Sequence, residues 1–378
     1  MQWVCREERE GRRGIGVSGL RGEPWRMLDC IRRWGALEFG AMASKSDRSA
    51  KPQPPPLPET IRETQELMEK LEAAAGMPCL AYWISTSGSI CQNDVMAMAH
   101  LLKGLPQSRT IGLFIKSDGG NPEAALRLVH LIRQYFQRLV LFAPFECASA
   151  ATMVALGANE VQMGPTSYLT AVDTSLKHEL SPVNQNNYRV SVSQNEVSRI
   201  LRMWREAKTE GNPFPELYKY LHPLVLGALD RSSSLSIRIC EELLSYHLKD
   251  PRKIKRISRQ LNSAYPSHSY PITSREAARL GLKVTALDPT VERLLRDLNA
   301  SYSHLAESVI TDYNDQNYHN REVCNLIERR GKRIQYIIDK EWFYRKEERQ
   351  WIPMNDRSSW QQLELKGRAW VSQKFHIR

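Results

Sequence analysis

The residues Cys147-Ala-Ser-Ala-Ala-Thr-Met-Val-Ala-Leu-Gly157 are the stretch that decides the fold of this chain. The apolar run Leu139–Phe142 leads into it and predicts a buried strand. Small residues follow, and an apolar helical pattern then ends at Gly157, a residue that suits a helix C-cap. Ser149 therefore lies at a strand-to-helix corner, beside helix amides that have no partner within the helix. This position suits a nucleophile, and it also suits an N-cap, which is the commoner use of such a serine.

Predicted strands and helices alternate along the chain on both sides of this corner. The turn Ser117-Asp-Gly-Gly-Asn-Pro122 follows one predicted strand, with Asn121 as N-cap and Pro122 at the first helical position. The predicted strands are Cys79–Ile84, Thr110–Lys116, Arg138–Ala143, Glu160–Met163 and Leu282–Ala286, with helices such as Asn93–Lys103 and Ala148–Leu156 between them. Strand–helix units at this interval predict an α/β fold with a mainly parallel sheet covered by helices.

The chain divides into three sections by composition and pattern. We expect residues 1–58 to be a tail that is Pro-rich near its end, and residues 1–41 to be an upstream extension without a folded role. The α/β domain is predicted over residues 59–288, with a helical insertion at about 191–262. Residues 289–378 are predicted to form a small C-terminal α+β module.

Capping signals mark two helices of this domain. Ser193 and Glu196 have the spacing of a capping box at the start of the insertion, and Thr273 and Glu276 have the same spacing further on. Gly281 then suits the C-cap of the second helix.

The C-terminal section is predicted to contain hairpins. One turn is expected at Arg330-Gly331-Lys332. Its aromatic residues could stack on nucleic-acid bases, but the core of a small β appendage is their commoner use: Trp342, Phe343, Tyr344, Trp351 and Trp360.

Composition narrows the classes of protein that fit. The 378 residues contain no apolar run that approaches the roughly 20 residues of a membrane span, and the N-terminus has no secretory signal. The seven cysteines are scattered and form no CxxC pair, which indicates reduced thiols, a cytoplasmic protein and no zinc site. The net charge of +11 is spread thinly, which favours a solvated basic face over a specific nucleic-acid groove.

Three separated pieces of the sequence resemble one known superfamily. Phe114–Ala125, with its double glycine, resembles the strand, turn and helix of Clp protease proteolytic subunits and signal peptide peptidase A. Ala148–Gly164 resembles their nucleophile helix and next strand, and Thr273–Val284 their later helix. The stretch His268-Ser-Tyr-Pro-Ile272 and the helical insertion are similar to the serine dehydrogenase proteinase family. The resemblance covers roughly residues 79–286 and implies a Clp/crotonase-type ββα spiral.

The resemblance also implies a set of site residues. Ser149 would be the nucleophile that attacks a peptide carbonyl. The amides of Gly119 or Gly120, together with that of Ala150, would stabilise the oxyanion, and glycine allows the close backbone approach that this needs.

The general base is the point at which the sequence departs from the family pattern. Asp173 occupies the place where Clp subunits have a histidine, and His268 lies where they have the triad aspartate. An exchanged arrangement follows, in which His268 accepts the Ser149 proton and Asp173 orients His268. The alternatives are a loop histidine bonded to backbone, a turn carboxylate, or a base from Lys177 or His178.

The sequence hypothesis is a cytoplasmic serine hydrolase, a peptidase that acts on peptide or protein substrates without a metal or other cofactor. The resemblance also implies a homo-oligomer. One alternative is a catalytically inactive pseudoprotease that serves as an interaction scaffold. Another is an acyl-CoA-processing relative, which would use a similar pair of amides but would not need Ser149.

Overall fold

The computed structural model describes residues 57–105, 108–208 and 210–377. The predicted tail and upstream extension lie outside these residues, except that Leu57 and Pro58 begin the first described helix, α2 (Leu57–Ala75). Within the described part, no helix is both long and apolar enough to cross a membrane, and no three His, Cys, Asp or Glu side chains are grouped as a metal site would require.

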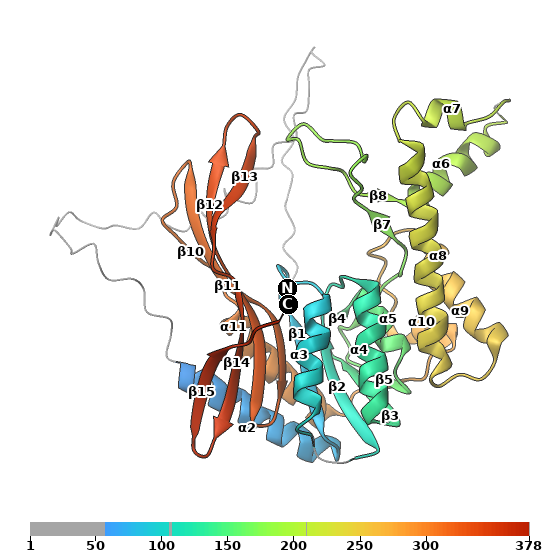
Figure 1. The fold of residues 1–378 in the computed structure, drawn as a ribbon. Helices are drawn as coiled ribbons and strands as arrows, with labels where there is room; N and C mark the ends of the chain where they lie inside the picture. The colour runs from blue at the N-terminus through green and yellow to red at the C-terminus, as the bar shows by residue number, and fades with distance from the viewer. Residues whose placement is uncertain (1–56, 106–107, 209, 378) are drawn as a thin grey trace, which may run out of the picture. The chain divides into compact units, whose positions relative to one another are not determined.

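The described strands include eleven that form one mixed sheet (Figure 1). Its parallel half has the strand order β1-β2-β3-β5-β9, and these are the strands that the sequence predicts: β1 (Cys79–Ile84), β2 (Thr110–Lys116), β3 (Arg138–Ala143), β5 (Glu160–Met163) and β9 (Val284–Ala286). Apolar residues fill most of β1, β2 and β3, which are buried on both faces, as the inner strands of a covered parallel sheet are.

The C-terminal section makes the other half of the sheet antiparallel. It contains α11 (Pro289–Leu305), β10 (Val309–Thr311), β11 (Asn317–Arg329), β12 (Lys332–Arg345), β13 (Gln350–Asp356), β14 (Ser359–Lys366) and β15 (Ala369–Lys374). The predicted hairpin is confirmed, since Gly331 turns between β11 and β12 with a φ of 77°. Because β11 pairs with β1, the sheet continues from residues 59–288 into residues 289–378, and the expectation of a mainly parallel sheet is wrong for the sheet as a whole.

Successive residues of β1 face two different cores. Leu80, Tyr82 and Ile84 pack with α3 (Gln92–Leu102), α4 (Pro122–Tyr135) and α5 (Ala150–Leu156). Cys79, Ala81 and Trp83 pack with α2 and α11 on the other face. This alternation is the two-residue period of a strand, and burial on both faces stabilises the sheet at about 25 cal/mol per Å² of apolar surface removed from water.

The range predicted as a helical insertion contains helices. Its helices are α6 (Gln194–Glu206), α7 (Phe214–Leu217), α8 (Pro223–Ser245) and α9 (Pro251–Ser263). The capping box of Ser193 and Glu196 is present at the start of α6. Thr273 precedes α10 (Ser274–Leu280) but its side chain makes no cap bond, so the second capping box is wrong, whereas Gly281 has the left-handed C-cap conformation that was predicted.

Candidate active site

Ser149 occupies a strained turn between two short elements. Strand β4 (Glu146–Cys147) pairs with β6 (Tyr168–Leu169), and α5 begins directly after the serine. The backbone of Ser149 has φ 53° and ψ −117°, and its side chain makes no cap bond to the helix. Non-glycine residues in such sparsely populated conformations cost about 1–3 kcal/mol each and persist where the surrounding structure holds them. The Ser149 hydroxyl therefore does not act as a helix N-cap, although an N-cap is the commoner use of a serine at such a corner. A strand–turn–helix geometry of this kind exposes a nucleophilic serine in known hydrolases.

Two buried threonines hold this turn. The N–H of Ser149 donates to Oγ1 of Thr170 at 2.7 Å. The N–H of Thr170 donates to Oγ1 of Thr152 at 3.0 Å, and the Thr152 hydroxyl donates to the carbonyl of Cys147 at 2.8 Å. The sequence alone assigns no role to either threonine. No sequence pattern distinguishes a buried threonine that hydrogen-bonds to distant backbone from one that only packs in the core.

The double-glycine turn lies against Ser149. Gly119 has a φ of 114°, and a Cβ on it would stand 2.6 Å from Cβ of Ser149 and 3.1 Å from the amide nitrogen of Ala150. A side chain is therefore excluded at Gly119, for both the conformation and the space. The structure brings Gly119, Ser149 and Ala150 together, as the sequence hypothesis requires.

Hydrogen bonds distinguish the two glycine amides. The N–H of Gly119 donates to Oγ of the buried Ser117 at 3.0 Å. The carbonyl of Gly119 accepts a bond from Ile90 N–H at 2.8 Å. Because Gly120 N–H belongs to the same planar peptide unit as that carbonyl, it points away from Ile90. That is the side on which Ser117 pairs with Cys147, next to the serine.

Two amides of the described chain are thus available to a substrate oxygen. Gly120 N–H has no hydrogen bond among residues 57–105, 108–208 and 210–377. Ala150 is the first residue of α5, so its N–H has no acceptor within the helix, and the helix dipole adds partial positive charge there. Of the alternatives left open by the sequence, the geometry favours Gly120 and Ala150 as the pair of oxyanion donors.

His268 and Asp173 form a hydrogen-bonded pair. Nδ1 of His268 lies 2.7 Å from Oδ1 of Asp173. The carboxylate side chain is buried at 8% exposure, whereas the histidine side chain is 48% exposed. The hydrogen bond that His268 donates to Asp173, helped by the charge of the carboxylate, raises the pKa of His268 against the opposing effect of burial. With its proton held at Nδ1, the neutral ring keeps Nε2 as a proton acceptor.

The main chain explains how residues distant in sequence form this pair. Leu169 and Ile272 exchange two backbone hydrogen bonds, at 3.0 and 2.8 Å, and so join the segment before Asp173 to the segment after His268. The other base candidates have different surroundings: Lys177 is exposed, and Nδ1 of His178 accepts the N–H of Leu180 within a local turn.

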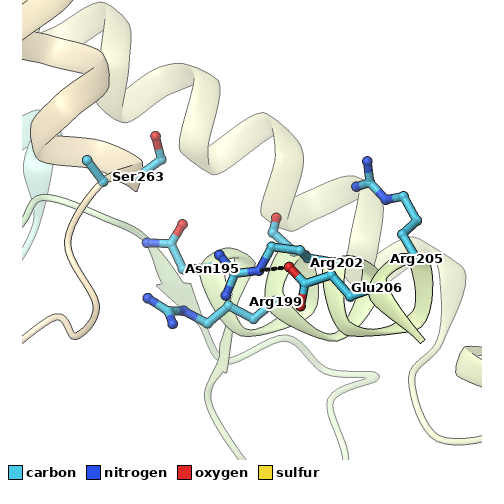
Figure 2. A pocket seen from close by; sticks show the side chains of 8 residues that line it. Asn195, Arg199, Arg202, Arg205, Glu206 and Ser263 are labelled. Atoms are coloured by element: carbon cyan, nitrogen blue, oxygen red, sulfur yellow. Dashed lines mark ion pairs between the residues drawn. The ribbon is translucent and has the colours of Figure 1, made fainter. Parts of the chain in front are cut away.

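A pocket of about 530 Å³ lies on the helical insertion (Figure 2). It is lined by side chains of α6 and of the end of α9, among them Arg199, Arg202 and Arg205. Arg202 pairs with Glu206 at 3.6 Å on the same helix, and Figure 2 shows Arg205 directed away from the other two arginines. None of the candidate catalytic residues lines this pocket, so it is not the site of the proposed chemistry.

Comparison with known proteins gives structural similarity at low sequence identity. No protein-family model and no curated protein matches the sequence. A variant of the 1510-N membrane-bound stomatin-specific protease, solved with a substrate peptide, is 16% identical, with a TM-score of 0.35 over 60% of this chain and 80% of that chain. ClpP1 from Listeria monocytogenes is 14% identical, with a TM-score of 0.33 over 60% of this chain and 98% of that chain. At this level of similarity, the roles of residues in this chain depend on its own geometry.

Proposed function

We propose that this protein is a serine peptidase of the Clp and signal peptide peptidase superfamily, which acts through an acyl-enzyme at Ser149. The backbone of Ser149 carries this proposal: a non-glycine residue at φ 53° and ψ −117° presents a hydroxyl that the helix does not use. Strain of this kind concentrates at functional sites. An ordinary N-cap serine has an extended backbone, and its hydroxyl oxygen accepts a hydrogen bond from a helix N–H.

The proposed reaction uses the serine turn, the two amides beside it and the His268–Asp173 pair. Oγ of Ser149 attacks the carbonyl carbon of a peptide bond while Nε2 of His268 takes its proton. The amides of Gly120 and Ala150 donate to the developing oxyanion. His268 then returns the proton to the leaving amine, and a water molecule, activated by the same ring, releases the acyl group from the serine. Asp173 holds the ring in the required tautomer throughout.

The finer assignments are part of the same proposal. We propose a Clp/crotonase-type ββα spiral on the three sequence pieces described above. We propose membership of the serine dehydrogenase proteinase family on the stretch His268–Ile272 and the helical insertion. We further propose that it is cytoplasmic, self-associates and acts on peptides or proteins without a cofactor.

A catalytically inactive scaffold is the second candidate function. One observation favours it: within the described residues, the Ser149 hydroxyl and His268 form no hydrogen bond, and the His268 side chain is half exposed. Catalytic hydrogen bonds are often long without substrate and tighten when it binds, so covalent reactivity, rather than this contact alone, distinguishes the two candidates.

Covalent labelling separates the two candidates. The protein is treated with a fluorophosphonate, digested and analysed by mass spectrometry. We expect the adduct on the peptide that contains Ser149, loss of the adduct in Ser149→Ala, and strongly reduced labelling in His268→Ala. The matched control is His319→Ala, because His319 forms a comparable pair with Asp339, at 2.9 Å, in the C-terminal strands. A wild-type protein without any adduct would favour the scaffold, and equal labelling of His268→Ala would remove that residue from the mechanism.

A further inference from the structure

Thr170 contacts the candidate nucleophile at a point that the proposed reaction does not use. Its Oγ1 accepts the N–H of Ser149 at 2.7 Å and its own hydroxyl proton goes to the carbonyl of Ala171 at 3.1 Å. We propose that Thr170 is a positioning residue that fixes the strained backbone of Ser149 in its reactive conformation. This inference rests on the proposed function and adds a residue to it.

The peptide unit before Ser149 is held at both ends. Its carbonyl, on Ala148, accepts the N–H of Ala151 at 2.9 Å, and its N–H donates to Thr170. The angle φ of Ser149 describes rotation about the bond that leaves this peptide unit. The carbonyl of Ser149 accepts the N–H of Met153 at 3.2 Å, so the peptide unit after Ser149 is held as well. With the units on both sides held, the angles φ and ψ are fixed, and with them the direction in which the Ser149 side chain leaves the backbone.

Thr170 also links the nucleophile to the base. Its main-chain N–H is bound to Thr152 on α5, and the chain continues to Asp173, whose carboxylate holds His268. Val172 N–H is anchored on the way, by the carbonyl of Leu261 at 3.0 Å. The side chain of Thr170 therefore joins Ser149 to the segment that carries the base pair.

The hydroxyl is the group that matters, because Thr170 is only 2% exposed. Thr170→Val keeps the shape of the side chain but leaves the N–H of Ser149 without an acceptor, and water has little access to replace it. An unsatisfied buried donor strongly favours a rotated peptide that can find another partner. Thr170→Ser keeps the acceptor and should keep the geometry.

The experiment measures conformation and reactivity separately in the full chain. Hydrogen exchange, read by mass spectrometry on peptides that cover residues 147–153, reports protection of the Ser149 amide without any need for catalysis. The rate of fluorophosphonate labelling, measured against probe concentration and pH, reports reactivity. Thr64→Val is the matched control, because Thr64 is a fully buried threonine that bonds to Glu328, outside the site.

We expect Thr170→Val to lose protection at Ser149 and to label about tenfold to a hundredfold more slowly at saturating probe, the range that one unmet buried donor allows. The probe concentration for half-maximal rate and the pH midpoint should stay near wild type, because the His268–Asp173 pair is intact. Thr170→Ser should restore both protection and rate. Thr64→Val should lower stability yet label at the wild-type rate.

Three results would overturn the role of Thr170. Unchanged protection in Thr170→Val would show that its hydroxyl does not hold Ser149. Lost protection with wild-type labelling would make the bond merely structural. Absence of labelling in the wild-type protein would overturn the peptidase proposal and this role with it, whereas the first two results overturn this role alone.

Discussion

Replacement of Gly119 by alanine tests the geometry of the oxyanion turn directly. The added Cβ would stand 2.6 Å from Cβ of Ser149, 3.0 Å from the carbonyl oxygen of Ala148 and 3.1 Å from the nitrogen of Ala150. The nearest of these groups belong to the backbone or directly to the serine, so no flexible side chain can move aside. The methyl group would also occupy space beside the Ala150 amide, where a substrate carbonyl oxygen must enter.

Two separate costs follow from this position. The φ of 114° is a conformation that costs a side-chain-bearing residue about 1–3 kcal/mol. Overpacking against the serine turn adds about 1–3 kcal/mol. Gly211 separates the two costs, because its φ is 102° but nothing lies within 4 Å of a Cβ placed there. Gly211→Ala should therefore show only the conformational cost.

Thermal unfolding and fluorophosphonate labelling measure the two effects in the same variants. We expect Gly119→Ala to unfold at a lower temperature than Gly211→Ala, and to label about 100-fold to 1,000-fold more slowly than wild type, as expected for loss of one oxyanion donor. Gly211→Ala should label like wild type. A Gly119→Ala protein that is folded and labels at the wild-type rate would refute the placement of the oxyanion donors beside Ser149.

Three further predictions concern charged groups. Because a base must be neutral, the rate of labelling should increase as the pH rises through the raised pKa of His268, above 6.5. Asp173→Asn should shift the midpoint of this pH–rate profile to lower pH, and an unmoved midpoint would contradict the pairing. Burial raises the pKa of Asp94 to about 6, so the stability that its protonated form contributes below pH 3.8 is lost as the pH rises through 6. In urea unfolding at several pH values, the free energy of unfolding of Asp94→Asn should therefore vary less with pH than that of the wild type. Arg333→Met leaves Glu328 buried without its ion pair at 2.9 Å and should cost about 3–5 kcal/mol in urea unfolding, much of which the double variant with Glu328→Leu should restore.

Local sequence patterns predict the elements of this fold because those patterns express local physics. The parallel strands, the start of α4 at Asn121 and Pro122, and the C-cap at Gly281 all follow from side-chain periodicity or backbone preference near one point of the chain. The pairing of β11 with β1 does not, since it joins residues more than two hundred positions apart and either strand could have remained an edge. Addition of that antiparallel half is the main feature of the sheet that the patterns miss.

The candidate site divides in the same way. The contact of His268 with Asp173 was anticipated from an exchange of residue types, and the structure contains it, although the catalytic roles of the two residues stay predictions. The strain at Ser149 and its bond to Thr170 could not be anticipated. The backbone conformation of Ser149 depends on which hydroxyl, distant in sequence, accepts a hydrogen bond from its amide. No local sequence pattern predicts that hydrogen bond.

The two halves of the site are held with very different stiffness. The serine turn is fixed by buried backbone and threonine groups, whereas His268 lies on a surface turn closed by Ser267 and Ser269, whose hydroxyls are 3.0 Å apart. Its ring is tied to the body by one carboxylate and is open to water, which competes for its hydrogen bonds. Moving His268 therefore requires breaking one partly exposed hydrogen bond, while moving the serine would require breaking several buried bonds. A substrate that covers the turn at 267–269 would reduce that competition, so the proposed reactivity of Ser149 should depend on what covers His268 as well as on the geometry of the serine turn.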